Sequence, residues 1–430
     1  MFLRMKIAVV GLWHLGEIYS AGLAELGHTV IGIDTDKQAV KNLNNNTPPL
    51  AEPGLQDLLV KNRKAGRLAY TTDFSKISDC DAVWLTLDTP IDRTDTARLQ
   101  SIFKTFGKIA PHLRDGAYVV VSSQMPVGTS GKVKKFLHEK NPRIKFEYVY
   151  TPENLQLGQA VKSFFEASRI VVGAENESAF ETMRAVFGGL NTNIMTMNPT
   201  EAEMVKHALN SFLATSLSFT YDIADLCEQV GADIVKISKA LRSDPRIGQK
   251  AYIDANIGFS GGTLGRDLRF LLAAAVEHGI SMPVIAAVMK KNKHRKKIVY
   301  EKLEKHLGSI AGKSIAVLGL TYKPGTTTLR RSLALEIVRD LRKMGAKLNL
   351  HDPFVKKTGF ISDLYETLSG CEAVLVITPW PELFGLDFSR ARSLMKEPAI
   401  FFDTRNFFHE KEAAIKQAGF KYLGVGRGMV

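Results

Sequence analysis

A stretch near the start of the chain is repeated near its end, and this repeat constrains the fold more than any other feature. The apolar run Ile7–Leu12 closes on a glycine turn and is echoed by Ile315–Leu320. Each copy continues with helical spacing, a glycine, a second apolar run and an aspartate, Asp34 or Asp352. Alternation of short apolar strands with helical segments is typical of a parallel sheet covered by helices. We therefore predict an α/β protein with two doubly wound domains.

The segment between the two copies has a different pattern. From Thr200 an apolar periodicity of the helical kind runs to about Val230, where Gly231 is expected to stop it, and more helix is expected to about Leu307. The sequence thus predicts three parts: residues 1–199, a helical segment at 200–308 with a long central helix, and residues 309–430.

Composition limits the classes of function. The chain has 430 residues, a net charge of +13 and three cysteines, Cys80, Cys227 and Cys371. These cysteines form no CxxC pair and no Cys/His cluster, so we predict neither a metal site nor a disulfide framework. No apolar run approaches the ~20 residues of a membrane helix. The first residues lead directly into a strand without a signal-peptide pattern, and we expect a cytoplasmic protein with no membrane contact.

The positive charge is densest at Lys290–Lys297. This stretch follows a helical pattern and has no interleaved aromatic residues on which bases could stack. We therefore expect a solvated helix face here, and no nucleic-acid partner.

The loop after the first strand has the features of a dinucleotide site. Such a site needs glycines for a tight turn, a helix N-terminus to meet the pyrophosphate, and an acid about 20 residues later for the ribose. Trp13 stands where the usual middle glycine would be, so an ordinary strand–helix turn is the alternative. The acid favours NAD over NADP. The residues expected to contact NAD are Gly11, Trp13, His14, Leu15, Gly16 and Asp34.

An ordered series of segments resembles the UDP-glucose/GDP-mannose dehydrogenase family over nearly the whole chain. The segments are Asn44–Leu55, Thr89–Pro90, Pro126–Thr129, Thr151–Leu155, Glu203–Asn210, Arg246–Gly248, Gly258–Asp267, Leu318–Pro324 and Asp403–Asn406.

The resemblance implies that a Rossmann-like domain at 1–199 binds NAD and that a second one at 309–430 binds a nucleotide sugar. The central helix would mediate a homodimer. Enzymes of this family oxidise a hexose C6 alcohol twice, to a uronic acid, through a cysteine-bound intermediate. We expect a UDP-linked substrate from general similarity.

The family's catalytic positions are largely retained. Lys206 and Asn210 are four residues apart, so on a helix they share one face, where a cation and an amide can stabilise an oxyanion. Glu153 and Asp267 match acid–base positions. Singly, each could be an ordinary solvated or structural residue; their joint match favours catalysis.

The resemblance also assigns binding residues. Further cofactor contacts are expected from Thr89, Gln124 and Arg330, although Arg330 could instead form a surface ion pair. The expected substrate contacts are Leu155, Lys206, Asn210, Arg246, Gly261 and Lys323.

One departure affects the chemistry. The family's nucleophile loop contains a cysteine, whereas Gly258–Asp267 contains none. Counting back from Asp267 places Thr263 at the cysteine position, and aligning the paired glycines places Leu264 there. A threonine hydroxyl is far less acidic than a thiol, so a covalent second oxidation by the family route is disfavoured and the role of Thr263 stays open.

Other departures surround the same pocket. Gln124 replaces a threonine, Thr327–Thr328 replace two aspartates, and Gly265 replaces a proline of the family pattern. We interpret the chain as a divergent member of the family.

Three hypotheses follow. The first is a dehydrogenase that makes a uronic acid without a thioester, and the second is a two-electron oxidoreductase that stops at an aldehyde or ketone. The third is a nucleotide-sugar binder without turnover, which the retained Lys206, Asn210 and Asp267 argue against. We place the first slightly ahead of the second.

Overall fold

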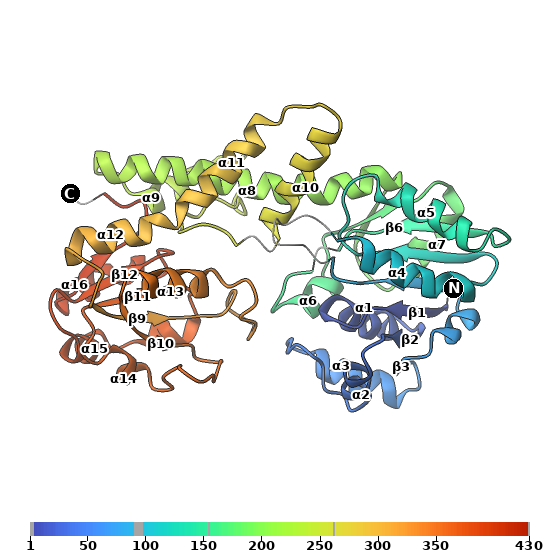
Figure 1. Ribbon diagram of the computed structural model, residues 1–430, viewed down its shortest axis with the longest axis horizontal. Coiled ribbons are helices and arrows are strands. Elements are labelled where there is room, and N and C mark those ends of the chain that lie inside the picture. Colours follow the sequence, from blue (N-terminus) through green and yellow to red (C-terminus); the bar gives the residue numbers. More distant parts are fainter. Residues whose placement is uncertain (1–3, 90–97, 154, 261–262, 429–430) are drawn as a thin grey trace. The chain divides into compact units, whose positions relative to one another are not determined.

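The computed structural model describes residues 4–89, 98–153, 155–260 and 263–428. Two compact units divide the chain: residues 1–209 with 269–279, and residues 210–268 with 280–430. Figure 1 shows a sheet flanked by helices in each unit and the long helix α8, Pro199–Val230, whose residues belong partly to each. The prediction of two parallel sheets and a long central helix is confirmed.

The first unit contains an eight-stranded sheet of order β3-β2-β1-β4-β5-β6-β7-β8. Neighbouring strands run parallel except β6 and β7, which are antiparallel. The strands are β1 Lys6–Val10, β2 Thr29–Ile33, β3 Leu68–Thr71, β4 Ala82–Leu85, β5 Ala117–Val121, β6 Phe146–Tyr150, β7 Arg169–Gly173 and β8 Asn193–Met197.

Helices cover both faces of this sheet. Because successive side chains of a strand point to opposite faces, Ile7 and Val9 join one apolar cluster and Ala8 and Val10 the other. The helices of this unit are α1 His14–Glu25, α2 Lys37–Asn44, α3 Leu55–Lys64, α4 Gln100–Ile109, α5 Thr129–Lys140, α6 Ala160–Phe165 and α7 Glu177–Val186. Helices α1, α3, α6 and α7 pack in the first cluster, and α4 and α5 in the second.

The second unit repeats this plan with a five-stranded parallel sheet of order β10-β9-β11-β12-β13. Its strands are β9 Ser314–Leu318, β10 Lys347–His351, β11 Ala373–Val376, β12 Ile400–Asp403 and β13 Lys421–Leu423. The remaining helices are α9 Ile234–Ser243, α10 Leu264–Glu277, α11 Pro283–Arg295, α12 Lys297–Leu307, α13 Leu333–Lys343, α14 Leu364–Leu368, α15 Phe388–Leu394 and α16 Glu412–Gln417. Short 3-10 helices are η1 Phe74–Asp79, η2 Ala110–His112, η3 Pro381–Gly385 and η4 His409–Lys411.

The start of α8 differs by two positions from the expectation, which took Thr200 as the residue that caps the helix. The helix begins at Pro199 rather than after Thr200, because the side chain of Asn198 accepts a hydrogen bond from the Glu201 amide at 2.9 Å. Glu201 in turn accepts one from the Asn198 amide at 2.8 Å. This reciprocal pair is a capping box. The helix ends before Gly231, whose φ of +75° favours glycine, as predicted.

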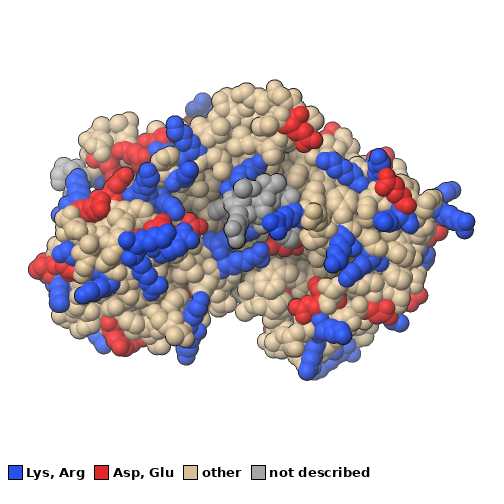
Figure 2. Space-filling model, viewed as in Figure 1, with Lys and Arg blue, Asp and Glu red and all other residues tan. Residues whose placement is uncertain are grey.

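The basic stretch Lys290–Lys297 ends α11 and begins α12, and the prediction of a solvated face is wrong for part of it. Lys291 contacts Asp222 and Asp225 at 2.6 Å, and Arg295 is buried against Asp225. Lys296 lies 3.4 Å from Glu336. The stretch therefore helps hold α8 and α13 within the second unit. On the face of the molecule drawn in Figure 2, lysine and arginine side chains are interspersed with acidic side chains.

Among the helices in the described part of the chain, none is long and apolar enough to span a membrane. The same residues contain no group of His, Cys, Asp and Glu side chains placed to hold a metal ion.

Candidate active site

The turn after β1 is built by two glycines. Gly11 has φ +98°, a conformation that side-chain-bearing residues rarely adopt. Gly16 lies so close to it that a Cβ at position 16 would be 1.8 Å from the Gly11 carbonyl oxygen. The turn and the first turn of α1 thus require glycine at both positions.

Helix α1 begins directly after this turn, and its N-terminus is uncapped. Among the described residues, no side chain accepts a hydrogen bond from the first backbone amides of α1. The uncapped N–H groups and the positive end of the helix dipole are a ready site for a pyrophosphate. Trp13 precedes the helix and is 45% exposed, His14 opens it, and Leu15 packs partly into the core.

Asp34 lies at the carboxyl end of β2, beside the turn. One carboxylate oxygen accepts a hydrogen bond from the Leu12 amide at 2.7 Å, and the other accepts one from the Asp36 amide at 3.0 Å. The side chain is partly exposed and keeps capacity to accept more hydrogen bonds. Glycine turn, uncapped helix and acid together fit an adenine dinucleotide with free ribose hydroxyls.

Two further strand ends are joined beside the turn. The buried Thr89 hydroxyl, after β4, donates a short hydrogen bond to the Gln124 carbonyl, after β5. Both residues therefore lie at the carboxyl edge of the sheet, where ligands of such sheets bind.

Helix α8 contacts these strand-end loops through one stretch. Glu203 accepts hydrogen bonds from the amides of Gly128 at 2.6 Å and Ser130 at 2.7 Å, and thereby caps α5. His207 bonds the Met125 carbonyl at 2.8 Å. Burial raises the pKa of Glu203, against the lowering effect of its donors. These contacts fix the rotation of α8 about its axis.

Lys206 lies between these contacts and reaches the loop after β6. Its ammonium donates a hydrogen bond to the Glu153 carbonyl at 2.6 Å and lies 3.4 Å from the Glu153 carboxylate. Glu153 also accepts a hydrogen bond from the Leu155 amide at 2.9 Å. The first unit thus brings together three of the predicted site residues.

The second unit brings together another pair. The Asn210 amide donates a short hydrogen bond to the fully buried carboxylate of Asp267 on α10. Thr263 immediately precedes α10, and its hydroxyl lies 3.5 Å from that of Tyr322. Leu264 instead packs with Ala214, Leu268 and Val288 in an apolar cluster.

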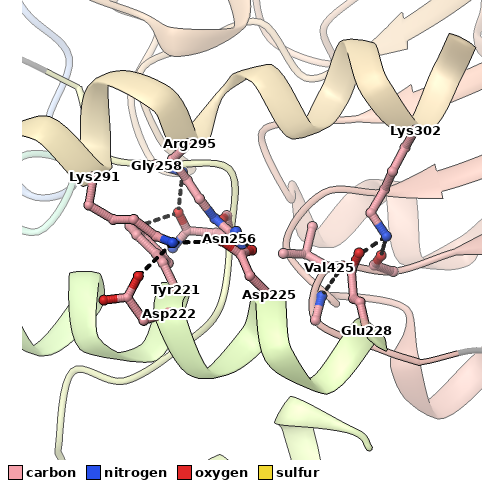
Figure 3. A network of polar contacts seen from close by, with 12 residues as sticks. Tyr221, Asp222, Asp225, Glu228, Asn256, Gly258, Lys291, Arg295, Lys302 and Val425 are labelled. Carbon is pink, nitrogen blue, oxygen red and sulfur yellow. Dashed lines mark hydrogen bonds and ion pairs between the residues drawn. The ribbon is translucent and has the colours of Figure 1, made fainter. Parts of the chain in front are cut away.

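A buried polar network holds the segment that leads to Thr263. Figure 3 shows Arg295 and Lys291 of α11 facing the acids of α8. Arg295 donates to the Asn256 carbonyl at 2.8 Å, and the Asn256 side chain accepts hydrogen bonds from Tyr221 and from the Gly258 amide, each at 2.8 Å. The glycine-rich segment is therefore anchored before it reaches α10.

Three further predicted binding residues, two for the substrate and one for the cofactor, belong to the second unit. Arg246 has an 89% exposed side chain and forms a two-point contact with Asp244, at 2.7 and 3.0 Å. Its guanidinium lowers the pKa of the Asp244 carboxyl. Lys323 and Arg330 lie in the loop after β9, in the second unit. Gly261 lies outside the described residues.

Comparison with known proteins places this site in a family. Models of the UDP-glucose/GDP-mannose dehydrogenase family match the NAD binding domain at residues 5–191, the central domain at 200–294 and the UDP binding domain at 316–410. The UDP-glucose 6-dehydrogenase TuaD of Bacillus subtilis is 33% identical, over 99% of this chain and 94% of its own length. The chain belongs to the UDP-glucose/GDP-mannose dehydrogenase family.

Solved structures agree. A UDP-glucose dehydrogenase from Pyrobaculum islandicum superposes with a TM-score of 0.90 and 28% identity, covering 100% of this chain and 99% of that one. A UDP-D-ManNAc dehydrogenase from Pyrococcus horikoshii gives 0.89 and 26%, with 99% and 100% coverage. The predictions of an NAD-binding domain and of a nucleotide-sugar dehydrogenase are confirmed at the level of the family.

The predicted site residues and domain boundaries stay predictions, although the three matched segments follow the predicted order. Glu52 and His14 form a contact that sequence analysis did not predict, because the bond joins residues 38 positions apart. The only signal was the Glu52-Pro53-Gly54-Leu55 motif, which carries no information about its partner. Glu203 and His207 were likewise part of a motif without an assigned role.

Proposed function

We propose that this family member oxidises the C6 alcohol of a UDP-hexose to a uronic acid with NAD, without a covalent cysteine intermediate. The observation that carries the proposal is the location of the thiols. All three cysteines of the chain are buried, and each lies in a different apolar cluster. Burial raises the pKa of Cys80 and of Cys371 to about 11, and it also raises that of Cys227. A buried thiol with little thiolate at neutral pH is a poor nucleophile.

The residues present support the first oxidation. Bound NAD supplies the hydride acceptor. In our proposal Lys206, whose ammonium is nearly buried and close to Glu153, donates a hydrogen bond to the sugar oxygen as negative charge develops on it. Asp267, oriented by Asn210, accepts the hydroxyl proton. Thr263 is not needed as a nucleophile in this scheme.

The second oxidation would proceed through the hydrated aldehyde. Water adds to the aldehyde carbon, and the hydrate then loses one hydride and one proton to give the carboxylic acid. The overall reaction consumes one alcohol, one water and two NAD, and it yields one acid, two NADH and two protons. Lys206 and Asp267 would act on the hydrate as they do on the alcohol.

The alternative is a two-electron oxidation that stops at an aldehyde or ketone. This alternative is favoured by the absence of a cysteine from the segment Gly258–Asp267, because a site without a thiol can release the aldehyde before water adds. A binder without turnover is less well supported, since Asp267 and Lys206 are buried polar groups that binding alone does not require.

The deciding experiment measures NADH formed per nucleotide sugar consumed, across UDP-hexoses and UDP-N-acetylhexosamines, with product mass determined. We expect two NADH and a uronic acid for one UDP-hexose. One NADH with an aldehyde or ketone product would establish the alternative, and no NADH with any sugar would remove the enzymatic proposal.

We also propose a homodimer formed through α8. Phe212, Phe219 and Leu226 recur every seven residues, so they lie on one face of the helix, and their exposed fractions are 69%, 52% and 58%. Exposed large apolar side chains in such a row mark an interaction surface. Phe219→Asp should give a monomer in size-exclusion chromatography with light scattering, whereas Ser393→Asp, at an exposed position of α15, is the control. A wild-type monomer would contradict the proposal.

A further inference from the structure

Glu52 is a buried carboxylate whose hydrogen bonds join two functional loops of the first unit. One oxygen accepts hydrogen bonds from the His14 ring at 2.7 Å and from the Gly158 amide at 2.6 Å. The other accepts one from the Ala160 amide at 3.0 Å. His14 opens α1 at the dinucleotide turn, and residues 158–160 end the loop that follows β6.

These bonds complete a helix that cannot cap itself. Helix α6 begins at Ala160, and among the described residues the side chain of its N-cap residue, Gln159, forms no capping hydrogen bond. Glu52 supplies the missing acceptor from more than 100 residues away in sequence. A carboxylate at a helix N-terminus satisfies amides that would otherwise lack a partner.

The segment so anchored carries predicted substrate contacts. The described residues between β6 and α6 are 151–153 and 155–159, and they include Glu153 and Leu155. Lys206 forms a hydrogen bond with the Glu153 carbonyl near the start of this segment, and Glu52 accepts one from the Gly158 amide near its end. The position of Glu153 therefore depends on both anchors.

Of the two carboxyl groups in this region, Glu52 carries the charge. Glu17, one turn along α1 from His14, is fully buried, and its carboxyl has no hydrogen-bond partner among the described residues. Burial, and then the charge of Glu52, raise the pKa of Glu17 to about 9. Burial alone would raise the pKa of Glu52 as well, but the hydrogen bonds from His14, Ala160 and Gly158 hold it below its ordinary value.

We infer that His14 and Glu52 are positioning residues that couple the dinucleotide turn to the described residues between β6 and α6, which include the predicted substrate contacts. Cofactor at the turn restrains His14, His14 restrains the Glu52 carboxylate, and Glu52 restrains the amides at 158 and 160. The inference extends the proposed function, since it gives NAD a role in ordering the loop that meets the sugar. Any coupling of this kind is reciprocal, so an ordered loop also favours cofactor binding.

The test uses amide hydrogen exchange of the full chain with and without NADH, and no sugar. In the wild type, saturating NADH should slow exchange at Gly158 and Ala160 about fivefold or more, the lower end of ordinary coupling between sites. In His14→Leu this protection should vanish. His14→Gln, whose amide can donate at the position of the ring nitrogen, should restore it.

Three controls keep the outcome interpretable. Occupancy by NADH is checked by quenching of Trp13, since Trp84 and Trp380 are buried. Glu25→Gln, on the same helix but paired with Lys61, should leave the protection unchanged. Glu52→Gln should raise exchange at Gly158 and Ala160 even without NADH, because one acceptor and the charge are lost.

Equal NADH protection in His14→Leu and the wild type would overturn the inference, as would no protection in a wild type that binds NADH. Because no sugar is present, either result is independent of which sugar, if any, the enzyme oxidises. Conversely, a failed sugar screen with intact, His14-dependent protection would count against the proposed function alone.

Discussion

The two sheets carry the same strand–glycine–strand–aspartate framework, but the turn that follows the first glycine differs between them. In the first unit α1 begins at His14, three residues after Gly11, and its first amides have no side-chain cap. In the second unit α13 does not begin until Leu333, well after Gly319, and the Ser332 hydroxyl caps it. The helix N-terminus that would meet a pyrophosphate is thus open in one unit and closed in the other.

The two aspartates differ in the same sense. Asp34 is partly exposed and bonds two backbone amides. Asp352 is buried, and one of its oxygens accepts hydrogen bonds from the Leu320 and Thr321 amides, at 2.7 and 3.1 Å, and from the Trp380 indole at 3.2 Å. A carboxylate so fully used by its own unit has little capacity left for a ribose. The repeated sequence pattern therefore specifies the sheet, whereas the helix amides and carboxylate oxygens that can still form hydrogen bonds determine which ligand binds.

The largest effect is expected from adding a side chain to the glycine turn after β1. Gly16→Ala would place a Cβ 1.8 Å from the Gly11 carbonyl oxygen, so the turn and the start of α1 must separate. We expect NADH affinity to fall about 1000-fold, or about 4 kcal/mol, in a fluorescence titration. Gly131→Ala, where an added Cβ meets nothing within 4 Å, is the matched control. Wild-type affinity in Gly16→Ala would mean that the cofactor does not use this turn.

A second difference concerns the acids in the first turns of α1 and α13. Glu17 is buried with its pKa raised to about 9, whereas Glu336 lies 3.4 Å from Lys296. Between its ordinary pKa and the raised one, the folded state binds the extra proton, so stability falls as pH rises. Each pH unit in that interval is worth about 1.4 kcal/mol.

Relative to wild type, the free energy of unfolding of Glu17→Gln should therefore rise by about 4 kcal/mol between pH 5 and pH 8. Glu336→Gln should show no such gain. The measurement is urea unfolding at both pH values. A pH-independent difference for Glu17→Gln would show that its carboxyl is charged or hydrated in the folded protein.

Exchanging each aspartate for asparagine separates ligand binding from stability. Asp34→Asn should weaken NADH binding about 30-fold, or about 2 kcal/mol, because a charged acceptor for the ribose is lost. Asp352→Asn should leave binding unchanged and lower the melting temperature, because an amide donor would face backbone donors in a buried site. Calorimetry and NADH titration of both variants check this. The reverse assignment of effects would refute the comparison.

Much of the fold was predictable because it depends on local patterns. Buried parallel strands such as Lys6–Val10 are continuous apolar runs, and Gly231 ends α8 through its own backbone preference. The antiparallel pairing of β6 with β7 was not predicted, since the sequence of a strand does not state the direction of its neighbour. Helix α8 also starts at a capping box that one-dimensional spacing placed slightly too late.

The geometry of the site could be predicted only where a single short motif contains all the residues that contact one another. The turn at Gly11 and Gly16 is contained in six residues, and so its geometry follows from the sequence. The contact of Glu52 with Ala160 and that of Asn210 with Asp267 join distant segments, which become neighbours only after the sheet and helices have packed. The ion pairs that part of the basic stretch Lys290–Lys297 forms also join residues distant in sequence, and for that reason they were not predicted.

The smallest expected effect tests whether the bond from Trp380 to Asp352 is what keeps a dinucleotide from the turn after β9. Trp380→Phe keeps an aromatic ring against Phe354, whose ring centroid lies 4.6 Å away, but removes the indole donor to Asp352. The loss of one hydrogen bond to a charged acceptor should cost about 1.5 kcal/mol, seen as a drop of a few degrees in melting temperature. NADH should still bind once per chain in calorimetric titration, because α13 remains capped by Ser332. A second bound NADH would show that the indole is the sole barrier, and that the capped helix does not exclude the cofactor.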